Sequence, residues 1–218
     1  MSKKLFLFPF GGNAREALLS VLAANEKNQE WDIMGFIDDD QAKHGKECCG
    51  VKVLGGKETI KRVVDAFILA VPGNPANYYK RADIIDSLQI DKSRFASIIH
   101  PSVVIAPDAM IGYNTLIMPN VVVSCGVKIG NHCIFLPNTI VSHDSVVGDY
   151  CCLGSNISIS GSVKIDKNCY VGSGTKVREN VSVGERTLLG LGSNVLSDIG
   201  SEVIAAGNPA KVIKRSIP

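Results

Sequence analysis

The candidate general acids and bases of this 218-residue chain are its four histidines: His44, His100, His132 and His143. An imidazole has a pKa of about 6.5, so it can take up and release a proton at neutral pH. His143 differs from the others because a carboxylate, Asp144, follows it directly. We therefore treat His143 as the candidate base, against the simpler interpretation of a solvated surface histidine.

Three turns carry residues that could hold a nucleotide. Each follows a predicted strand, over residues 4–8, 31–37 and 66–71, and helices are predicted over residues 14–24 and 77–88. Alternating strands and helices predict a small parallel α/β sheet, whose ligands bind at the carboxyl ends of the strands. The expected substrate-binding residues at that edge are Gly11, Gly12, Asn13, Asp38, Asp39, Gly73 and Asn74. The alternative is that each turn is an ordinary exposed loop.

A six-residue repeat dominates the second half of the chain. Large apolar residues recur at every sixth position from Ile105 to Val195, and a small or β-branched residue follows each of them by four. Neither a helix nor a strand has a period of six. A triangular coil does, because three six-residue sides make one turn that stacks on the next at about 4.8 Å. We expect a little over five coils, with corners that favour Gly, Asn or Asp at positive φ.

The cysteines do not form a recognisable metal motif. There are 7 of them, an odd number without paired spacing, which predicts reduced thiols, a cytoplasmic location and no metal site. Cys133, Cys151 and Cys169 follow the coil period, so they should stack on one inner edge between Thr115 and Thr187. We interpret them as small residues that fill a column rather than as a redox ladder.

Composition and charge exclude several classes of protein. The net charge is +2 and 45% of the residues are hydrophobic, which favours a packed core and argues against nucleic-acid or membrane-surface partners. The first eight residues lack a cleavage site and are better interpreted as a strand than as a signal peptide. No apolar run approaches the roughly 18 residues that a membrane span needs.

A small α/β sheet followed by a six-residue repeat resembles the hexapeptide-repeat, left-handed β-helix family of sugar-nucleotide acetyltransferases. This family includes UDP-4-amino-sugar N-acetyltransferases and sialic acid O-acetyltransferases. The resemblance rests on the repeat and on three segments, residues 36–39, 140–149 and 206–213. It implies an α/β, Rossmann-like nucleotide-sugar-binding domain over residues 1–97. A left-handed parallel β-helix acyltransferase domain with a C-terminal tail would occupy residues 98–218. A homotrimer with active sites between neighbouring coils is also implied.

The family's activity would be transfer of acetyl from acetyl-CoA to the amino group of a UDP-linked amino sugar, in bacterial glycan or lipopolysaccharide biosynthesis. By resemblance, His143 is the general base and Asp144 holds the second ring nitrogen. Gly161 would donate its backbone N–H to the oxyanion. The expected contacts with the cofactor are Cys152, Gly161, Ser173, Leu191, Pro209 and Lys214.

Some residues depart from the family pattern. Its first turn has the form Gly-x-Gly-Gly-His-Gly, but here Pro9, Asn13 and Ala14 replace the first glycine, the histidine and the last glycine, which argues against a dinucleotide. Cys152 stands where the family often has a second histidine. A three-histidine zinc site is not indicated, because Cys125 and Gly161 lie one coil away from His143.

Two alternative functions stay open. The first is an O-acetyltransferase of a sugar hydroxyl, of the sialic acid type. The second is a non-catalytic sugar-nucleotide-binding scaffold.

Overall fold

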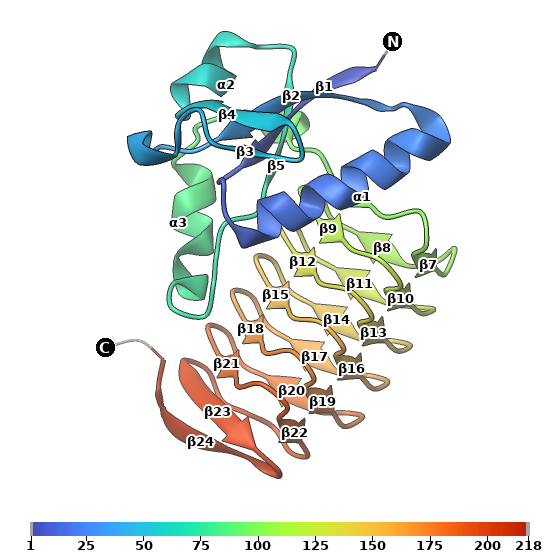
Figure 1. Cartoon of the computed structure of the whole chain (residues 1–218). Helices are drawn as coiled ribbons and strands as arrows, with labels where there is room; N and C mark the ends of the chain where they lie inside the picture. Colours follow the sequence, from blue (N-terminus) through green and yellow to red (C-terminus); the bar gives the residue numbers. More distant parts are fainter. Residues whose placement is uncertain (1, 217–218) are drawn as a thin grey trace.

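The computed structural model describes residues 2–216, which form an α/β sheet followed by a three-sided parallel β-helix (Figure 1). The strand order in the sheet is β3-β4-β2-β1-β5. The strands are β1 (Lys3–Phe8), β2 (Trp31–Ile37), β3 (Glu47–Cys48), β4 (Val51–Gly55) and β5 (Phe67–Ala70). All of them pair in parallel except β3 with β4. The sequence predicted β1, β2 and β5 but missed the β3–β4 hairpin, whose strands lack an apolar run.

Helices cover both faces of this sheet because the central strand β1 alternates its side chains between two cores. Leu5 and Leu7 pack against α1 (Gly12–Asn28), whereas Phe6 and Phe8 pack against α2 (Glu58–Arg62) and α3 (Arg81–Asp86). Short 3₁₀ turns, η1 (Gln41–Lys43), η2 (Tyr78–Lys80) and η3 (Lys92–Arg94), complete this part of the chain. Among residues 2–216, no helix has the length and apolar character that crossing a membrane requires.

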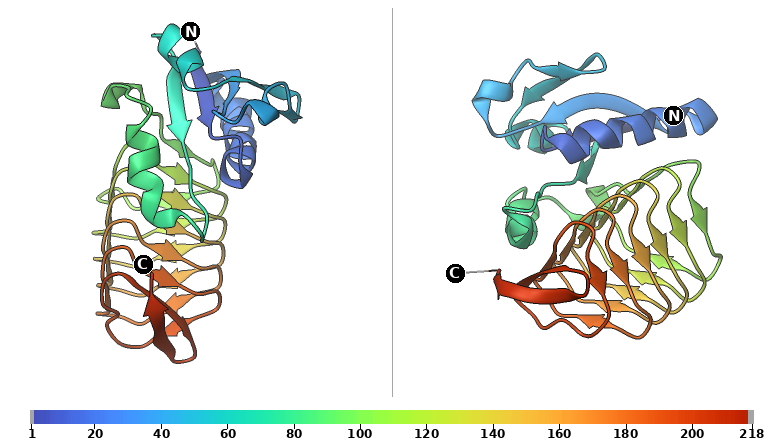
Figure 2. Two further views of the ribbon diagram at one scale, coloured as in Figure 1. Left: turned by 90° about the vertical axis from the view of Figure 1, so that its left-hand side faces the viewer. Right: turned by 60° about the horizontal axis from the view of Figure 1, so that its bottom comes forward.

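The β-helix has three walls of short parallel strands, which we number in chain order (Figure 2). Wall 1 contains β6 (Ile98–Ile99), β9 (Leu116–Ile117), β12 (Ile134–Phe135), β15 (Cys152–Leu153), β18 (Tyr170–Val171) and β21 (Leu188–Leu189), and is extended by the hairpin of β23 (Val203–Gly207) and β24 (Ala210–Arg215). Wall 2 contains β7 (Val104–Ile105), β10 (Val122–Val123), β13 (Ile140–Val141), β16 (Ser158–Ile159), β19 (Lys176–Val177) and β22 (Asn194–Val195). Wall 3 contains β8 (Met110–Ile111), β11 (Lys128–Ile129), β14 (Val146–Val147), β17 (Lys164–Ile165) and β20 (Ser182–Val183).

The six-residue repeat sets the register of these walls. Each strand of the repeat from β7 to β22 ends on the large apolar residue of its hexad, and these residues form one continuous core along the inside of the coil. Consecutive strands of one wall pair in parallel with residues 18 positions apart, as in Val123 with Val141. The predicted repeat and its inward face are confirmed.

The corners confirm the expected preference for Gly, Asn or Asp at positive φ. Asn114 and Asp144 adopt it, as do Gly126, Gly174 and Gly192 at equivalent corner positions, but the glycine directly after many of the large residues does not. At Gly130, an added Cβ would lie 2.7 Å from the backbone nitrogen of Asp149 on the next coil. Glycine is therefore needed there because adjacent coils approach closely, while asparagine and similar residues adopt the left-handed conformation at the turn itself.

The stacked cysteines fill a polar column, as predicted. The Sγ atoms of Cys133, Cys151 and Cys169 each reach a carbonyl oxygen of the next corner, at 3.2, 3.1 and 3.2 Å. Thr115 and Thr187 make the equivalent bonds through Oγ1 at the two ends of the column. Burial raises the pKa of the Cys133 thiol to about 12 and raises that of the Cys151 thiol as well, so these two thiols are chemically inert.

The α/β part packs against wall 1. The outward side chains of that wall, Leu116, Ile134 and Cys152, are buried in the same core as Leu5 and Leu7 of β1. Wall 1 is therefore covered within one chain, and the corner between walls 2 and 3 lies on the opposite side of the prism.

A buried arginine joins the two parts. Arg81 is fully buried and its guanidinium donates to the backbone oxygens of Tyr150 (2.9 Å), His132 (2.5 Å) and Pro72. Carbonyl groups thus replace water around this charge, which would otherwise be costly to bury. Because Pro72 follows β5, the same contacts hold the loop after β5 against a corner of the β-helix.

His132 lies beside this arginine and is 4% exposed. Its Nδ1 is 2.8 Å from Nδ2 of Asn114, and its ring stacks on Tyr150 with centroids 4.7 Å apart. Burial and the neighbouring Arg81 charge lower the pKa of His132 to about 4. The imidazole is therefore neutral at pH 7 and serves as part of the packing between the two parts of the chain.

We predict that this histidine makes the protein less stable in mild acid. The pKa of His132 is lower in the folded state than in the unfolded state, so below about pH 6.5 the unfolded chain binds the proton more readily. The free energy of unfolding should fall as the pH drops from about 6.5 to about 4. His132→Asn, which suits this left-handed corner, should flatten that part of the profile measured by urea denaturation. An unchanged slope would contradict the assignment.

Candidate functional site

The carboxyl edge of the α/β sheet encloses a cavity of about 400 Å³. It lies where β1, β2 and β5 end, and α1 begins at its rim. All of the residues that the sequence indicated for this edge line it: Gly11, Gly12, Asn13, Asp38, Asp39, Gly73 and Asn74. The structure therefore brings these three turns together, as expected for the ligand edge of a parallel sheet.

The side chain of Asn13 connects two of these turns. Its Nδ2 donates to the backbone oxygens of Val71 (3.2 Å) and Gly73 (3.1 Å). Gly11 is the N-cap of α1 and no side chain caps the helix there. The first N–H groups of α1 face the cavity rim with no side-chain acceptor, an arrangement that favours an anion.

The two aspartates of the cavity differ in their surroundings. Asp38 is 5% exposed, and its Oδ2 pairs with Nζ of Lys43 at 2.9 Å. Asp39 is exposed and accepts the backbone N–H of Lys57 at 2.8 Å. Asp38 therefore orders the loop after β2, whereas the exposed carboxylate of Asp39 contacts Lys57 through both of its oxygens, at the backbone N–H and, at 3.9 Å, at Nζ.

Lys43 is a lining residue that the sequence analysis missed. It lies in η1, five residues beyond Asp38, and places the only lysine or arginine side chain among the residues that line this cavity. Nothing in its local sequence distinguishes it from other surface lysines. Only the fold of the loop after β2 brings its ammonium group to the same cavity as Gly12.

His143 lies on the outside of the β-helix, at the corner between walls 2 and 3. Its Nδ1 is 2.9 Å from Oδ2 of Asp144, and the two side chains are 59% and 68% exposed. Asp144 adopts φ of +60°, so the chain turns directly after His143. This turn brings the carboxylate back to the ring, which orients the imidazole and directs Nε2 away from the carboxylate.

Gly161 lies one coil beyond His143 and directly beneath its ring. A Cβ added to Gly161 would be 2.5 Å from both Cε1 and Nε2 of the imidazole. The 18-residue coil period therefore explains this pair, because it stacks position 161 on position 143. Among the described residues, the N–H of Gly161 has no backbone acceptor.

The remaining candidate cofactor residues lie elsewhere on the chain. Ser173 and Leu191 stack at the corner between walls 1 and 2, where Leu191 is 76% exposed. Pro209 and Lys214 belong to the exposed β23–β24 hairpin that extends wall 1. One chain therefore does not bring these residues together with Gly161.

Cys152 departs from its expected position. Its side chain is 2% exposed and packs in the core between wall 1 and the α/β sheet. The family's second histidine position is here filled by a small apolar residue that the α/β part covers. We therefore leave Cys152 out of the candidate site.

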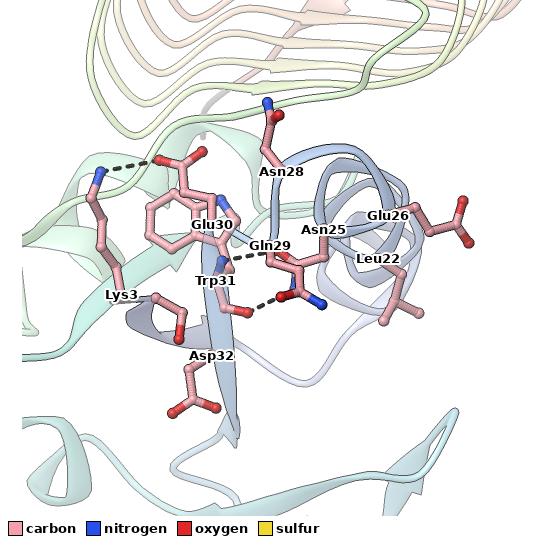
Figure 3. Close-up of a pocket in the computed structure, with 10 residues that line it drawn as sticks. Lys3, Leu22, Asn25, Glu26, Asn28, Gln29, Glu30, Trp31 and Asp32 are labelled. Atoms are coloured by element: carbon pink, nitrogen blue, oxygen red, sulfur yellow. Dashed lines mark hydrogen bonds and ion pairs between the residues drawn. The ribbon is translucent and has the colours of Figure 1, made fainter.

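A larger hollow, of about 1120 Å³, lies at the opposite edge of the α/β sheet (Figure 3). It is open and bounded by the end of α1 and the start of β2, where Asn25 bonds the backbone of Trp31 and Lys3 pairs with Glu30. This is the amino edge of the strands, and these polar groups satisfy one another. We assign no site to it.

Comparisons with known proteins agree with this architecture. The family model described as the GMPPB C-terminal domain matches residues 95–200, just under half of the chain. No curated protein matches the chain in sequence.

Solved structures match over nearly the whole length. PerB from Caulobacter crescentus, in complex with CoA and GDP-perosamine, has a TM-score of 0.83 at 23% identity and covers 97% of both chains. The acetyltransferase domain of PglB from Neisseria gonorrhoeae, in complex with acetyl coenzyme A, has a TM-score of 0.84 at 23% identity, covering 98% of this chain and 100% of that one. WeeI from Acinetobacter baumannii has a TM-score of 0.83 at 22% identity, with the same coverage. The chain thus has the predicted fold, an α/β domain followed by a left-handed parallel β-helix, and shares it with sugar-nucleotide N-acetyltransferases.

Proposed function

We propose that this chain is an acetyl-CoA-dependent N-acetyltransferase that acts on the amino group of a nucleotide-linked amino sugar. The observation that carries the proposal is the outward-facing His143, oriented by Asp144 and seated over Gly161. The shared fold supports it, because the similar PerB structure binds CoA and GDP-perosamine. We further propose a UDP-linked substrate, a cytoplasmic location and a role in bacterial glycan or lipopolysaccharide biosynthesis.

The residues around Gly161 fit an acyl donor. The absence of a Cβ at Gly161 lets the His143 ring lie directly against the backbone there, and the backbone N–H of Gly161 has no backbone acceptor. Acetyl-CoA supplies an activated thioester, so no nucleophilic side chain is needed. The N–H of Gly161 would donate to the acetyl oxygen as negative charge develops on it.

His143 performs the proton transfer in this proposal. Nε2 takes the proton from the attacking amine, and the Asp144 carboxylate, 2.9 Å from Nδ1, stabilises the imidazolium that results. Exposure of the ring leaves Nε2 accessible to a substrate that comes from outside the prism. No other histidine among the described residues combines exposure with a carboxylate partner on the β-helix.

The cavity at the carboxyl edge of the sheet would hold the nucleoside diphosphate. The unpaired N–H groups at the start of α1 and the ammonium group of Lys43 are suitable donors to a diphosphate. The exposed carboxylate of Asp39 is a suitable acceptor for ribose or base groups. The substrate-binding residues predicted from the sequence keep their roles here, with Lys43 added.

The separation between the cavity and His143 suggests that the complete site forms between two copies of the chain. The cavity lies in the part of the chain that covers wall 1, and His143 lies at the opposite corner of the prism, so one chain cannot present both to one small substrate. We propose a homotrimer in which the cavity of one copy faces His143 of its neighbour. Exposed apolar residues flank that corner on walls 2 and 3, with Ile140 45% and Val146 37% exposed. Ser173, Leu191, Pro209 and Lys214 would then meet Gly161 across the same interface.

The alternatives are separable by experiment. Transfer to a sugar hydroxyl, as in a sialic acid O-acetyltransferase, would depend more steeply on His143, because a hydroxyl is far less acidic than an ammonium group. A non-catalytic sugar-nucleotide-binding scaffold would bind the nucleotide sugar without releasing thiol from acetyl-CoA.

The first prediction concerns the base. With acetyl-CoA and a panel of UDP- and GDP-linked amino sugars, His143→Ala should lower the rate of thiol release at least about a hundredfold. The loss follows because no other group near the amine can take its proton. His100→Ala, which changes a histidine bonded only to its neighbour Ser102, is the control and should retain activity. A His143→Ala rate close to that of the unchanged protein would remove the general-base role.

A substitution at Gly161 tests the contact between this residue and the His143 ring. Gly161 does not have a positive φ, so Gly161→Ala is allowed by the backbone, but its Cβ would collide with the His143 ring. We expect turnover to fall at least about tenfold, because a misplaced base loses its geometry, while the thermal midpoint changes little. Gly200→Ala, whose Cβ would meet nothing within 4 Å, is the matched control. Equal activity of the two alanine variants would show that the His143 imidazole does not act as the base from its place over Gly161.

The third prediction concerns assembly. Gly12→Glu places an acidic residue in the first turn of α1, where a Cβ meets nothing and the helix dipole tolerates the charge, but the carboxylate repels a diphosphate. Separately, Gly12→Glu and His143→Ala proteins should be nearly inactive. Mixed trimers, formed by co-expression, should regain activity because some interfaces combine an intact cavity with an intact His143. Activity no greater than the sum of the separate variants would place both halves of the site on one chain.

A further inference from the structure

Two adjacent cysteines lie together on the surface of the α/β part, outside the candidate site. Cys48 ends β3 and is half-buried, while Cys49 is exposed in the hairpin turn to β4. Their Sγ atoms are 3.9 Å apart. The proposed acetyl transfer uses neither of them.

Cys49 is an unusual residue for its position in this turn. Cys48 pairs with Val51, so Cys49 and Gly50 form a two-residue hairpin turn with φ of +49° and +77°. Such turns favour asparagine or aspartate before the glycine, because other residues with a side chain are strained at positive φ. The side chain of Cys49 is exposed, so no packing requirement accounts for a cysteine there. The turn holds this thiol beside Cys48 at an energetic cost.

The sulfur–sulfur distance is closer to that of a chelate than to that of a disulfide. Trivalent arsenic is pyramidal, with angles of about 95° between its bonds, so two bonds of about 2.3 Å to sulfur separate the sulfurs by about 3.4 Å. A disulfide requires about 2.05 Å, well short of the 3.9 Å between the Cys48 and Cys49 sulfurs. The two thiolates can therefore bind one thiophilic atom with little movement of the hairpin.

The side chains around Cys48 and Cys49 limit which thiophilic atom the two thiolates can bind. No group of three or more His, Cys, Asp or Glu side chains among residues 2–216 is placed to hold a metal ion, so a metal that needs three or four protein ligands is not satisfied here. A trivalent arsenical that carries one organic group needs only two sulfur ligands. Beside the thiols is a hollow of about 280 Å³ lined by Arg15, Glu16 and Leu19, with space for such a group.

The other cysteines lack this arrangement. Cys133, Cys151, Cys152 and Cys169 are all buried inside or against the core of the β-helix. Cys125 is exposed but has only Ser124 as a partner, at 3.9 Å. Cys125 therefore provides an exposed single thiol for comparison within the same chain.

We propose that Cys48 and Cys49 form a dithiol site that captures organic trivalent arsenicals and related acceptors of two thiolates. The reaction is a condensation without oxidation or reduction. Two S–As bonds form, the As=O bond of an arsine oxide breaks, and its oxygen leaves as water with the two thiol protons. The organic group of the arsenical lies in the hollow beside Leu19, which is 56% exposed.

The test treats the full-length reduced protein with one equivalent of phenylarsine oxide and measures intact mass. We expect one adduct, heavier by the mass of phenylarsine oxide less one water. The adduct should survive excess 2-mercaptoethanol but be removed by 2,3-dimercaptopropanol, because only a dithiol competes with a chelate.

Single-cysteine variants make the test specific. Cys49→Ser, at an exposed position, should bind the arsenical at least about a hundredfold more weakly because the chelate is lost. Cys48→Ser should do the same, and Cys125→Ser should bind like the unchanged protein. The proposal is wrong if the unchanged protein retains no adduct in 2-mercaptoethanol, or if Cys49→Ser, folded as judged by its thermal midpoint, retains one.

Discussion

The stacking of six-residue sides is the constraint on which the rest of this structure depends. Each side has room for one large inward side chain, and each coil pairs with the next in parallel so that residues 18 positions apart lie side by side. The interior is therefore one apolar column that tolerates little change. Side chains outside the column are aligned as strictly as those within it, which is how Gly161 comes to lie under the ring of His143.

The second constraint is that only one wall of the prism is covered. Wall 1 shares its core with the α/β sheet, and the buried Arg81 links Pro72, after β5, to a corner of the β-helix through backbone oxygens. This contact fixes the cavity at the carboxyl edge of the sheet relative to the prism and leaves the His143 corner on the far side. The proposed chemistry therefore places the cavity of one copy beside the imidazole of a neighbour.

Much of the fold was predictable because a period of six has no competing explanation. The repeat alone located β7 to β22 and their inward residues, and the β–α alternation located β1, β2 and β5 with the turns that line the cavity. What the sequence could not reveal depended on contacts between distant segments. Lys43 reaches the cavity only through the folded loop after β2, and Cys152 becomes buried only because the α/β part covers wall 1. Positive φ explains corner glycines such as Gly126, as expected, whereas close approach of the next coil explains Gly130.

The most direct test of the central claim is an experimental structure of the assembled protein with CoA and a nucleotide-linked amino sugar. The account predicts the nucleotide in the cavity beside Gly12 and Lys43 of one copy, with the sugar amine at hydrogen-bond distance from Nε2 of His143 in a neighbour. A sugar amine held away from every His143, or a nucleotide bound outside that cavity, would contradict it.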